Sequence, residues 1–347
     1  MPAPKPRDVL DRLEPAALRA ALALPPRVQG VLAGRPVLRD GQTLDVEVQL
    51  LLRMQRLTGR AGVGFTPASR PDIVRDARMV GGEQRVGGVR DLKVDGAEGH
   101  LAARLYVPAG LQGGSADPLL VFFHGGGFVT GGLESHDATC RVLAERGGVR
   151  VLAVDYRLAP ESPFPAAPED CASAYRWVVE HASELGADPE RLAVGGDSAG
   201  GNLAAVTAIT AAREGLPLAL QLLVYPCTDF AETAESRRTF ARGFFLTKAA
   251  MDAAHEQYLG ELDPSDPVAS PLYADLPEGM APAYVATAGF DPLRDEGEAF
   301  ARRLADAGVT VELQRFPSLI HGFFNMVGVG RSCPAAVGEI AERLRVL

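Results

Sequence analysis

The sequence lacks any run of lysine and arginine, and it has no basic stripe with interleaved aromatic residues. Its 347 residues carry 44 acidic and 35 basic side chains, which leaves a formal net charge of −9. Nucleic acid and anionic lipid are recognised through positively charged surfaces, because their phosphate groups are negative. We therefore expect neither nucleic acid nor an anionic membrane surface as a partner.

Long apolar stretches are missing as well. No segment approaches the ~20 consecutive apolar residues that span a bilayer. The longest candidate for the apolar core of a secretion signal, Ala20–Pro26, is short and ends in proline. Acidic residues precede it, where a signal peptide would carry positive charge. We expect no membrane insertion and a cytoplasmic location.

Cysteine is scarce, and its spacing matches no metal site. The four cysteines lie far apart, without a C-x-x-C pair or a histidine at ligand spacing. A chain of this length buries roughly three quarters of its surface on folding, so it needs no disulfide or metal for stability. Although three disulfide pairings are formally possible, we interpret the cysteines as small buried apolar residues, and we expect neither a metal nor an organic cofactor.

The sequence pattern of the first eighty residues predicts helices. Leu44, Val48 and Leu51 follow helical spacing within Leu44–Leu57. An earlier and weaker segment, Val9–Leu24, is interrupted by Pro15. We assign residues 1–80 to N-terminal helices that contribute to a cap.

After residue 80 short apolar runs alternate with segments of helix length, such as Pro168–Leu185 and Arg294–Ala307. The runs are Leu101–Val107, Leu119–Phe123, Val151–Val154, Leu192–Val194, Leu218–Tyr225, Tyr284–Ala288 and Val311–Phe316. This alternation is typical of a mostly parallel sheet with helices on both faces. We therefore predict an α/β catalytic domain over residues 81–347.

The alternation stops between Tyr225 and Tyr284. Nearly sixty residues are too many for a simple connection in a compact domain. The stretch contains a probable helix, Thr247–Leu259, followed by a proline-rich segment. We predict a cap insertion over about residues 228–275, which with the N-terminal helices covers the carboxyl ends of the strands.

A nucleophile motif lies where one of these strands meets a helix. Gly-x-Ser-x-Gly spans Gly196–Gly200, preceded by the apolar run Leu192–Val194 and followed by an alanine-rich segment. Such a strand-turn-helix context is that of a nucleophile elbow, which exposes a serine hydroxyl above the sheet. The motif therefore makes Ser198 the candidate nucleophile.

A serine nucleophile needs a histidine base and an orienting acid, which follow it in that order. Asp291 comes directly after the run Tyr284–Phe290, and His321 lies in the loop after the last strand. Asp295 is the rival acid, but its place in the first turn of a helix is explained by the helix dipole. We favour Asp291 as the acid and His321 as the base.

The oxyanion formed during acyl transfer needs backbone N–H donors. Ala199, directly after the candidate nucleophile, supplies one. Two further donors are expected among Gly125, Gly126 and Gly127, which follow the strand Leu119–Phe123. A phosphate-binding loop is the alternative, but the sequence patterns of such loops are absent here.

Together these motifs resemble the hormone-sensitive lipase family of α/β hydrolases, bacterial carboxylesterases marked by His-Gly-Gly-Gly and Gly-Asp-Ser-Ala-Gly-Gly. The matching stretches are His124–Phe128, Asp155–Glu161, Phe164–Asp170, Gly196–Asn202, Asp291–Gly297 and His321–Phe323. The resemblance implies an α/β-hydrolase fold with a helical cap, and a serine carboxylesterase of short to medium acyl esters. It also implies a supporting, unreactive position for Asp197.

Two other functions stay open at this point. An amidase or another acyl hydrolase would use the same residues, because the leaving group is selected by the pocket. A non-catalytic small-molecule-binding protein on this fold is disfavoured, since Ser198, Asp291 and His321 are all present. The expected partner is a small ester substrate, and a homodimer is possible.

The substrate pocket is the least determined part of the sequence. An apolar patch, Phe240 with Phe244–Leu246, stands within the otherwise charged insertion. We consider Phe128, Phe244 and Phe245 candidates for the pocket wall. The alternative is that the patch only anchors the insertion to the sheet domain.

Overall fold

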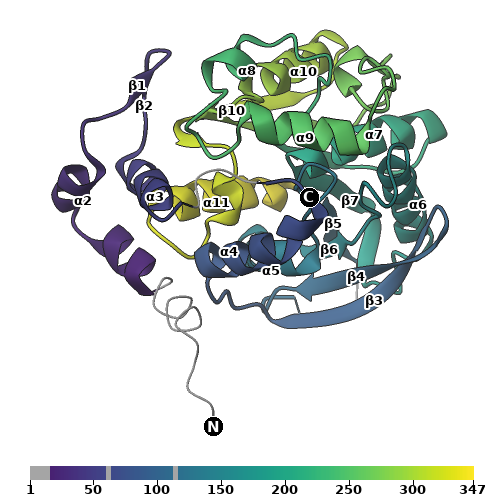
Figure 1. Ribbon diagram of the computed structural model, residues 1–347. Coiled ribbons are helices and arrows are strands. Elements are labelled where there is room, and N and C mark those ends of the chain that lie inside the picture. Colours follow the sequence, from purple (N-terminus) through teal and green to yellow (C-terminus); the bar gives the residue numbers. More distant parts are fainter. Residues whose placement is uncertain (1–15, 60–63, 112–115) are drawn as a thin grey trace.

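The computed structural model describes residues 16–59, 64–111 and 116–347. Its centre is an eight-stranded sheet in the order β10-β9-β8-β7-β5-β6-β4-β3 (Figure 1). Strand β4 runs antiparallel to its two neighbours, and the remaining pairs are parallel. The strands are β3 Gly88–Gly96, β4 Gly99–Val107, β5 Asp117–Phe123, β6 Arg150–Val154, β7 Ala187–Asp197, β8 Leu220–Val224, β9 Ala283–Phe290 and β10 Val311–Ile320.

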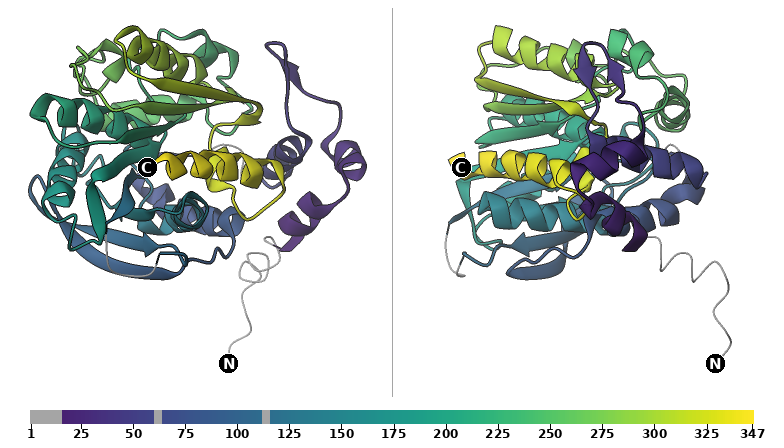
Figure 2. Two further views of the ribbon diagram at one scale, coloured as in Figure 1. Left: turned by 180° about the vertical axis from the view of Figure 1, so that it is seen from behind. Right: turned by 90° about the vertical axis from the view of Figure 1, so that its left-hand side faces the viewer.

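Helices cover both faces of this sheet (Figures 1 and 2). Successive side chains of β5 point to opposite faces, as the strand period requires. Leu119 and Val121 pack into a core with α6, α7 and α10, whereas Leu120 and Phe122 pack with α5 and α11. The helices are α5 Leu133–Gly147, α6 Ala166–Glu180, α7 Ala199–Glu214, α10 Arg294–Asp306 and α11 Ser332–Glu342. The predicted α/β fold is confirmed.

The sequence pattern does not predict strand β3, and the position of this strand in the sheet explains why. It lies at the edge of the sheet, and Val94 is its one buried residue. The other positions are charged or partly exposed, so the strand has no continuous apolar run. Edge strands with charged side chains resist pairing with other chains, which accounts for this composition.

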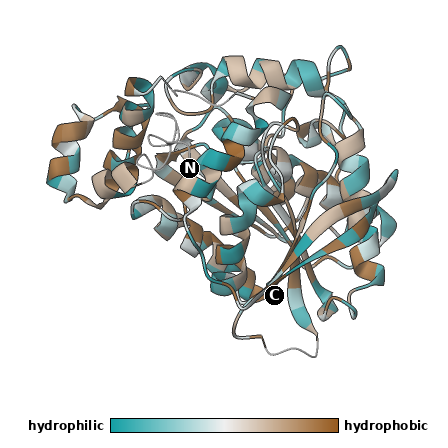
Figure 3. Ribbon diagram, turned by 60° about the horizontal axis from the view of Figure 1, so that its bottom comes forward, coloured by the Kyte–Doolittle hydropathy of each residue, from teal (hydrophilic) through white to brown (hydrophobic). Residues whose placement is uncertain are grey.

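The N-terminal segment lies beside α11, β10 and α5 (Figures 1 and 2). It contains a helix over residues 16–23, a small hairpin, and the helices α2 Pro26–Ala33, α3 Val46–Leu57 and α4 Arg70–Gly81. In Figure 3 these helices alternate between hydrophilic and hydrophobic residues. Helix α3 confirms the predicted helix over Leu44–Leu57. The predicted Val9–Leu24 segment lies partly outside the described residues.

Specific hydrogen bonds fasten this segment to the sheet domain. The Asp45 side chain caps α3 by accepting from the N–H of Glu47 and of Val48. One carboxylate oxygen of Glu47 accepts in turn from the N–H of Arg331 (2.6 Å) and of Ser332 (3.1 Å), at the start of α11. A carboxylate at a helix N-terminus is stabilising because the helix dipole is positive there.

The insertion between β8 and β9 carries two helices, α8 Glu235–Thr239 and α9 Lys248–Tyr258. Helix α9 matches the predicted Thr247–Leu259, with Thr247 as its cap: the hydroxyl accepts from Ala250 N–H. The insertion touches the N-terminal segment where the Gln257 amide donates to the Phe65 carbonyl (2.7 Å). These contacts support the proposal that the two segments form one cap.

Candidate active site

The turn between β7 and α7 places Ser198 in a strained backbone conformation, with φ +58° and ψ −116°. A non-glycine residue rarely adopts a positive φ, and such strain is concentrated at functional sites. The turn also brings Gly200 so close to the Phe123 carbonyl that no Cβ atom fits there. The glycines of the motif are therefore required by the turn that presents Ser198.

Three side chains that are far apart in sequence meet above the carboxyl edge of the sheet. Asp291 follows β9 and His321 follows β10, and both side chains are buried. His321 Nδ1 lies 2.7 Å from Asp291 Oδ2, and His321 Nε2 lies 3.0 Å from Ser198 Oγ. The three residues predicted from the sequence thus form one continuous hydrogen-bonded chain.

The surroundings of Asp291 determine the tautomer of His321. Asp291 Oδ1 accepts from the Leu293 N–H (2.8 Å), so the other oxygen is the one that faces His321. A carboxylate only accepts, so the proton on the facing side belongs to Nδ1 of the imidazole. His321 Nε2 is then free to accept the proton of the Ser198 hydroxyl.

Asp295, the rival acid, lies in a different environment. Its carboxylate accepts from the Ser236 N–H (2.9 Å) and from Arg294 Nε (2.7 Å). Within the described part of the chain no hydrogen bond joins Asp295 to His321. Its contacts connect α10 to the insertion, and this supports the choice of Asp291.

The loop after β5 separates the three glycines by role. The Gly125 N–H donates to Asp197 Oδ1 (2.9 Å), so this donor is occupied and is not available to an oxyanion. The N–H groups of Gly126, Gly127 and Ala199 donate to no acceptor within the described ranges. Of the glycines predicted as donors, Gly125 is thus already engaged, and Gly126 and Gly127 are the ones left available.

His124 holds this loop in place as a neutral ring. Burial, followed by the nearby His136, lowers the pKa of His124 to about 3. The neutral ring donates from Nδ1 to the Gly125 carbonyl (2.9 Å) and stacks on Tyr156 at a centroid distance of 4.3 Å. The Gly125 carbonyl is therefore turned toward the His124 ring, and the Gly126 N–H of the same trans peptide points the opposite way.

A small, mainly apolar cavity of about 40 Å³ adjoins Ser198 and the glycine loop. Both parts of the cap line it: Phe65 comes from the N-terminal segment, and Phe230, Leu246 and Met251 come from the insertion. The full lining is Phe65, Gly127, Phe128, Ser198, Ala199, Cys227, Phe230, Glu232, Arg237, Leu246, Met251, Ala254, His255 and Leu293.

Two predicted pocket residues lie outside this cavity. Phe244 packs against Phe240 and Phe290, with ring centroids 5.6 and 5.2 Å apart, and belongs to the core on the α11 side. Phe245 lies against Gly322, and it is not part of the cavity wall either. The anchoring interpretation therefore describes Phe244, whereas Phe128 does line the cavity.

This difference predicts an effect on substrate preference for one buried residue and an effect on stability for another, two positions away. Leu246→Ala should enlarge the cavity and shift preference toward longer acyl chains, by up to ~0.8 kcal/mol for each methylene newly buried. Phe244→Ala should leave the preference unchanged and lower the free energy of unfolding by about 3–5 kcal/mol. The test is to measure the dependence of ester hydrolysis on acyl length and the unfolding in denaturant for both variants. A changed dependence on acyl length in the Phe244 variant would contradict the assignment of Phe244 to the core.

A charged pair closes the cavity wall on the side of the insertion. Arg237 Nε lies 2.6 Å from Glu296 Oε2, and both side chains are buried. Burial raises the pKa of Glu296 to about 7, although the charge and hydrogen bonds of Arg237 oppose the shift. The pair ties α8 to α10 and so holds the insertion over the cavity.

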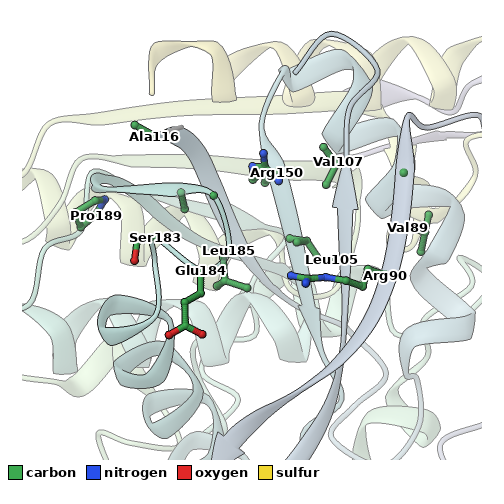
Figure 4. Close-up of a pocket in the computed structure, with 13 residues that line it drawn as sticks. Val89, Arg90, Leu105, Val107, Ala116, Arg150, Ser183, Glu184, Leu185 and Pro189 are labelled. Carbon is green, nitrogen blue, oxygen red and sulfur yellow. The ribbon is translucent and has the colours of Figure 1, made fainter. Parts of the chain in front are cut away.

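A larger hollow of about 740 Å³ lies at the other end of the strands (Figure 4). It is bordered by the starts of β5, β6 and β7 and includes Arg150, which is paired with Asp117 at 2.8 Å. Ligands of open α/β sheets bind at the carboxyl ends of the strands. Its position at the amino ends therefore makes it a poor candidate for the reaction site.

Neither a metal centre nor a membrane span is found in the described residues. Among residues 16–59, 64–111 and 116–347, no group of histidine, cysteine, aspartate and glutamate could hold a metal ion. No helix in these ranges is long and apolar enough to cross a bilayer.

Comparison with known proteins places this geometry among esterases. The sequence model of the α/β-hydrolase fold family matches residues 120–325. The carboxylic ester hydrolase LipN of Mycobacterium tuberculosis is 48% identical over 324 residues, which cover 90% of this chain and 85% of that protein. The ethyl acetate hydrolase of Pseudomonas putida is 40% identical over 261 residues, covering 74% and 82%.

Solved structures agree with the sequence relatives. An ester hydrolase from the metagenome of Lake Arreo, complexed with a bipyridine phosphonate derivative, superposes with a TM-score of 0.83 at 39% identity. The match covers 87% of this chain and 98% of that one. The hyperthermophilic esterase of Pyrobaculum calidifontis superposes with a TM-score of 0.80 at 38% identity, covering 86% and 97%.

Proposed function

The chain belongs to the hormone-sensitive lipase group of the α/β-hydrolase fold family, and from this membership we propose that Ser198 hydrolyses short to medium acyl esters through an acyl-enzyme intermediate. The chain is a carboxylic ester hydrolase, the activity that the names of its relatives share. The observation that carries the proposed mechanism is the hydrogen-bonded chain from Asp291 through His321 to Ser198.

In the proposed reaction the protein contributes groups that are already in position. His321 Nε2 takes the hydroxyl proton as Ser198 Oγ attacks the ester carbonyl, and Asp291 stabilises the imidazolium. The free N–H groups of Gly126, Gly127 and Ala199 bind the oxyanion of the tetrahedral intermediate. His321 returns the proton to the leaving alcohol, and water, activated by the same base, then hydrolyses the acyl-enzyme.

The cavity supports a preference at the short end of this range. Its volume is small, and aromatic and aliphatic side chains from both parts of the cap enclose it. An apolar pocket gains affinity with each buried methylene only until it is full. We therefore propose that acetyl to butyryl esters fit best, and that the cap, formed by residues 1–80 and about 228–275 over the domain 81–347, sets this limit.

A panel of p-nitrophenyl esters from acetate to dodecanoate, with the matching anilides, tests the proposal. We expect kcat/KM to peak between acetate and butyrate and to fall for longer chains, and we expect the anilides to react far more slowly. Anilide turnover equal to ester turnover would make the protein an amidase. A rate that rises steadily up to dodecanoate would contradict the small acyl site.

The cellular location and the oligomeric state of the protein can be tested separately from its activity. We propose that the protein works in the cytoplasm, where its four unpaired cysteines would remain reduced. A homodimer is compatible with the sequence. Cell fractionation and sedimentation of the purified chain measure both properties.

A further inference from the structure

Asp197 directly precedes the candidate nucleophile Ser198, and its carboxylate contacts the glycine loop. Its carboxylate is buried, and the Gly125 N–H donates to Oδ1 (2.9 Å). Tyr225 OH (3.3 Å) and the Asn325 amide (3.2 Å) donate to Oδ2. The direction of the Gly125 peptide, and with it that of the following N–H groups, is therefore fixed by where this carboxylate lies.

His136, on α5, completes the set of donors to Asp197. The side chain is buried, and Nε2 lies 3.1 Å from Asp197 Oδ1, the oxygen that accepts from Gly125. Nε2 also lies 3.2 Å from Asn325 Nδ2, the amide nitrogen that donates to Asp197 Oδ2. Lone pairs on Nε2 and on Asp197 Oδ1 would repel each other at 3.1 Å, so we infer that Nε2 carries a proton directed at this carboxylate. On the other side of the ring, Nδ1 lies 2.8 Å from Ser135 Oγ, which fixes the ring plane.

The charge state of Asp197 reflects this set of donors. Burial by itself would raise the pKa of the carboxyl group, because a charge loses its hydration in the interior. The charge and hydrogen bond of His136, followed by the Gly125 N–H, outweigh burial and lower the pKa of Asp197. The carboxylate stays ionised, so it accepts from Gly125 and His136 at the same time.

We propose that His136 is a positioning residue for ester hydrolysis, which acts by holding the Asp197 carboxylate that orients the Gly125 peptide and thereby the N–H groups of Gly126 and Gly127. The inference rests on the proposed role of those N–H groups as oxyanion donors. His136 does not line the cavity beside Ser198 and touches no reacting atom. Its effect reaches the reaction through two contacts of Asp197 Oδ1: the contact with His136 Nε2, and the hydrogen bond that the oxygen accepts from the Gly125 N–H.

Three substitutions at position 136 separate positioning from packing. His136→Gln keeps an N–H donor at about the reach of Nε2, His136→Asn places its amide too close to the backbone to reach Asp197, and His136→Leu fills space without a donor. Losing a single oxyanion donor costs ~10²–10³ in kcat. Because His136 acts one step away, we expect the Asn and Leu variants to lose about 10- to 100-fold in kcat.

The expected pattern is a loss in kcat with KM for p-nitrophenyl acetate changed less than twofold, and recovery of most of the loss by the Gln variant. A trifluoromethyl ketone, which forms a tetrahedral adduct with the serine, should bind more weakly to the Asn and Leu variants by the same factor as kcat/KM falls. His100→Gln, at an exposed histidine paired with Asp95, is the matched control and should change none of these values.

Different failures have different meanings. If the wild-type enzyme binds the ketone tightly and all three variants keep its kcat and affinity, the positioning role of His136 is wrong and the mechanism of Ser198 stands. If the wild-type enzyme does not bind the ketone at all, the proposed function itself fails. If the Leu variant does not fold, the Gln and Asn variants are compared with each other. Equal losses of kcat and of ketone affinity in these two variants would overturn the proposal.

Discussion

Replacing Ser198 with alanine is expected to lower the turnover of p-nitrophenyl acetate by on the order of 10⁵- to 10⁶-fold, with KM nearly unchanged. The change removes one oxygen atom, the atom that lies 3.0 Å from His321 Nε2. The oxyanion donors and the cavity remain, so some acceleration over the uncatalysed reaction should persist. Ester hydrolysis and circular dichroism of the same preparation measure activity and folding together.

His321→Ala should produce a loss of the same size, because the members of a catalytic triad act as a unit. For the same reason the Ser198 and His321 double variant should be hardly worse than either single variant. A folded Ser198→Ala enzyme that keeps more than a few per cent of wild-type turnover would remove Ser198 from the role of nucleophile. Losses that multiply in the double variant would show that the two residues act separately.

The second large effect is expected at Asp291, where asparagine should lower kcat by on the order of 10⁴-fold. The reason lies in the Leu293 N–H, which donates to Asp291 Oδ1 (2.8 Å). In the variant the amide oxygen keeps this bond, so the amide NH₂ faces His321 Nδ1. The imidazole must then accept at Nδ1 and carry its proton on Nε2, where it can no longer take the proton of Ser198.

Asp295→Asn is the matched control for this substitution. Asp295 lies four residues away and binds the Ser236 N–H and Arg294. Its replacement should change kcat by no more than a few-fold, with the main effect on thermal stability. The reverse ranking of the two variants in kcat would transfer the role of orienting acid to Asp295.

The strands and the reacting side chains could be predicted because each leaves a local pattern. Buried parallel strands such as β5 and β9 are continuous apolar runs, as burial on both faces requires. Ser198 lies in a motif whose glycines the turn demands, and Asp291 and His321 directly follow strands. Since the carboxyl ends of parallel strands share one edge of the sheet, the sequence order alone indicates that these residues meet.

The supporting residues could not be predicted, because their roles depend on contacts between distant segments. His136 is a single histidine on a helix, and only the packing of α5 brings it to Asp197. Phe65 enters the cavity wall from a segment without periodicity. The sequence does not distinguish Phe244 from a pocket residue, since an apolar side chain anchors an insertion as readily as it lines a cavity. The sequence likewise does not distinguish Gly125 from the two glycines that follow it, because the acceptor of its N–H, Asp197, lies 72 residues away in the chain.

Covalent labelling with a fluorophosphonate tests the central claim most directly, because the reagent phosphonylates an activated serine and marks the atom that attacks. Peptide mass spectrometry should find one label per chain, on the peptide that contains Ser198, with ester hydrolysis lost in proportion to labelling. The Ser198→Ala variant should take up no label under the same conditions. A wild-type enzyme that is fully inactivated while its label lies on another residue, or that hydrolyses esters undiminished with Ser198 labelled, would contradict the account.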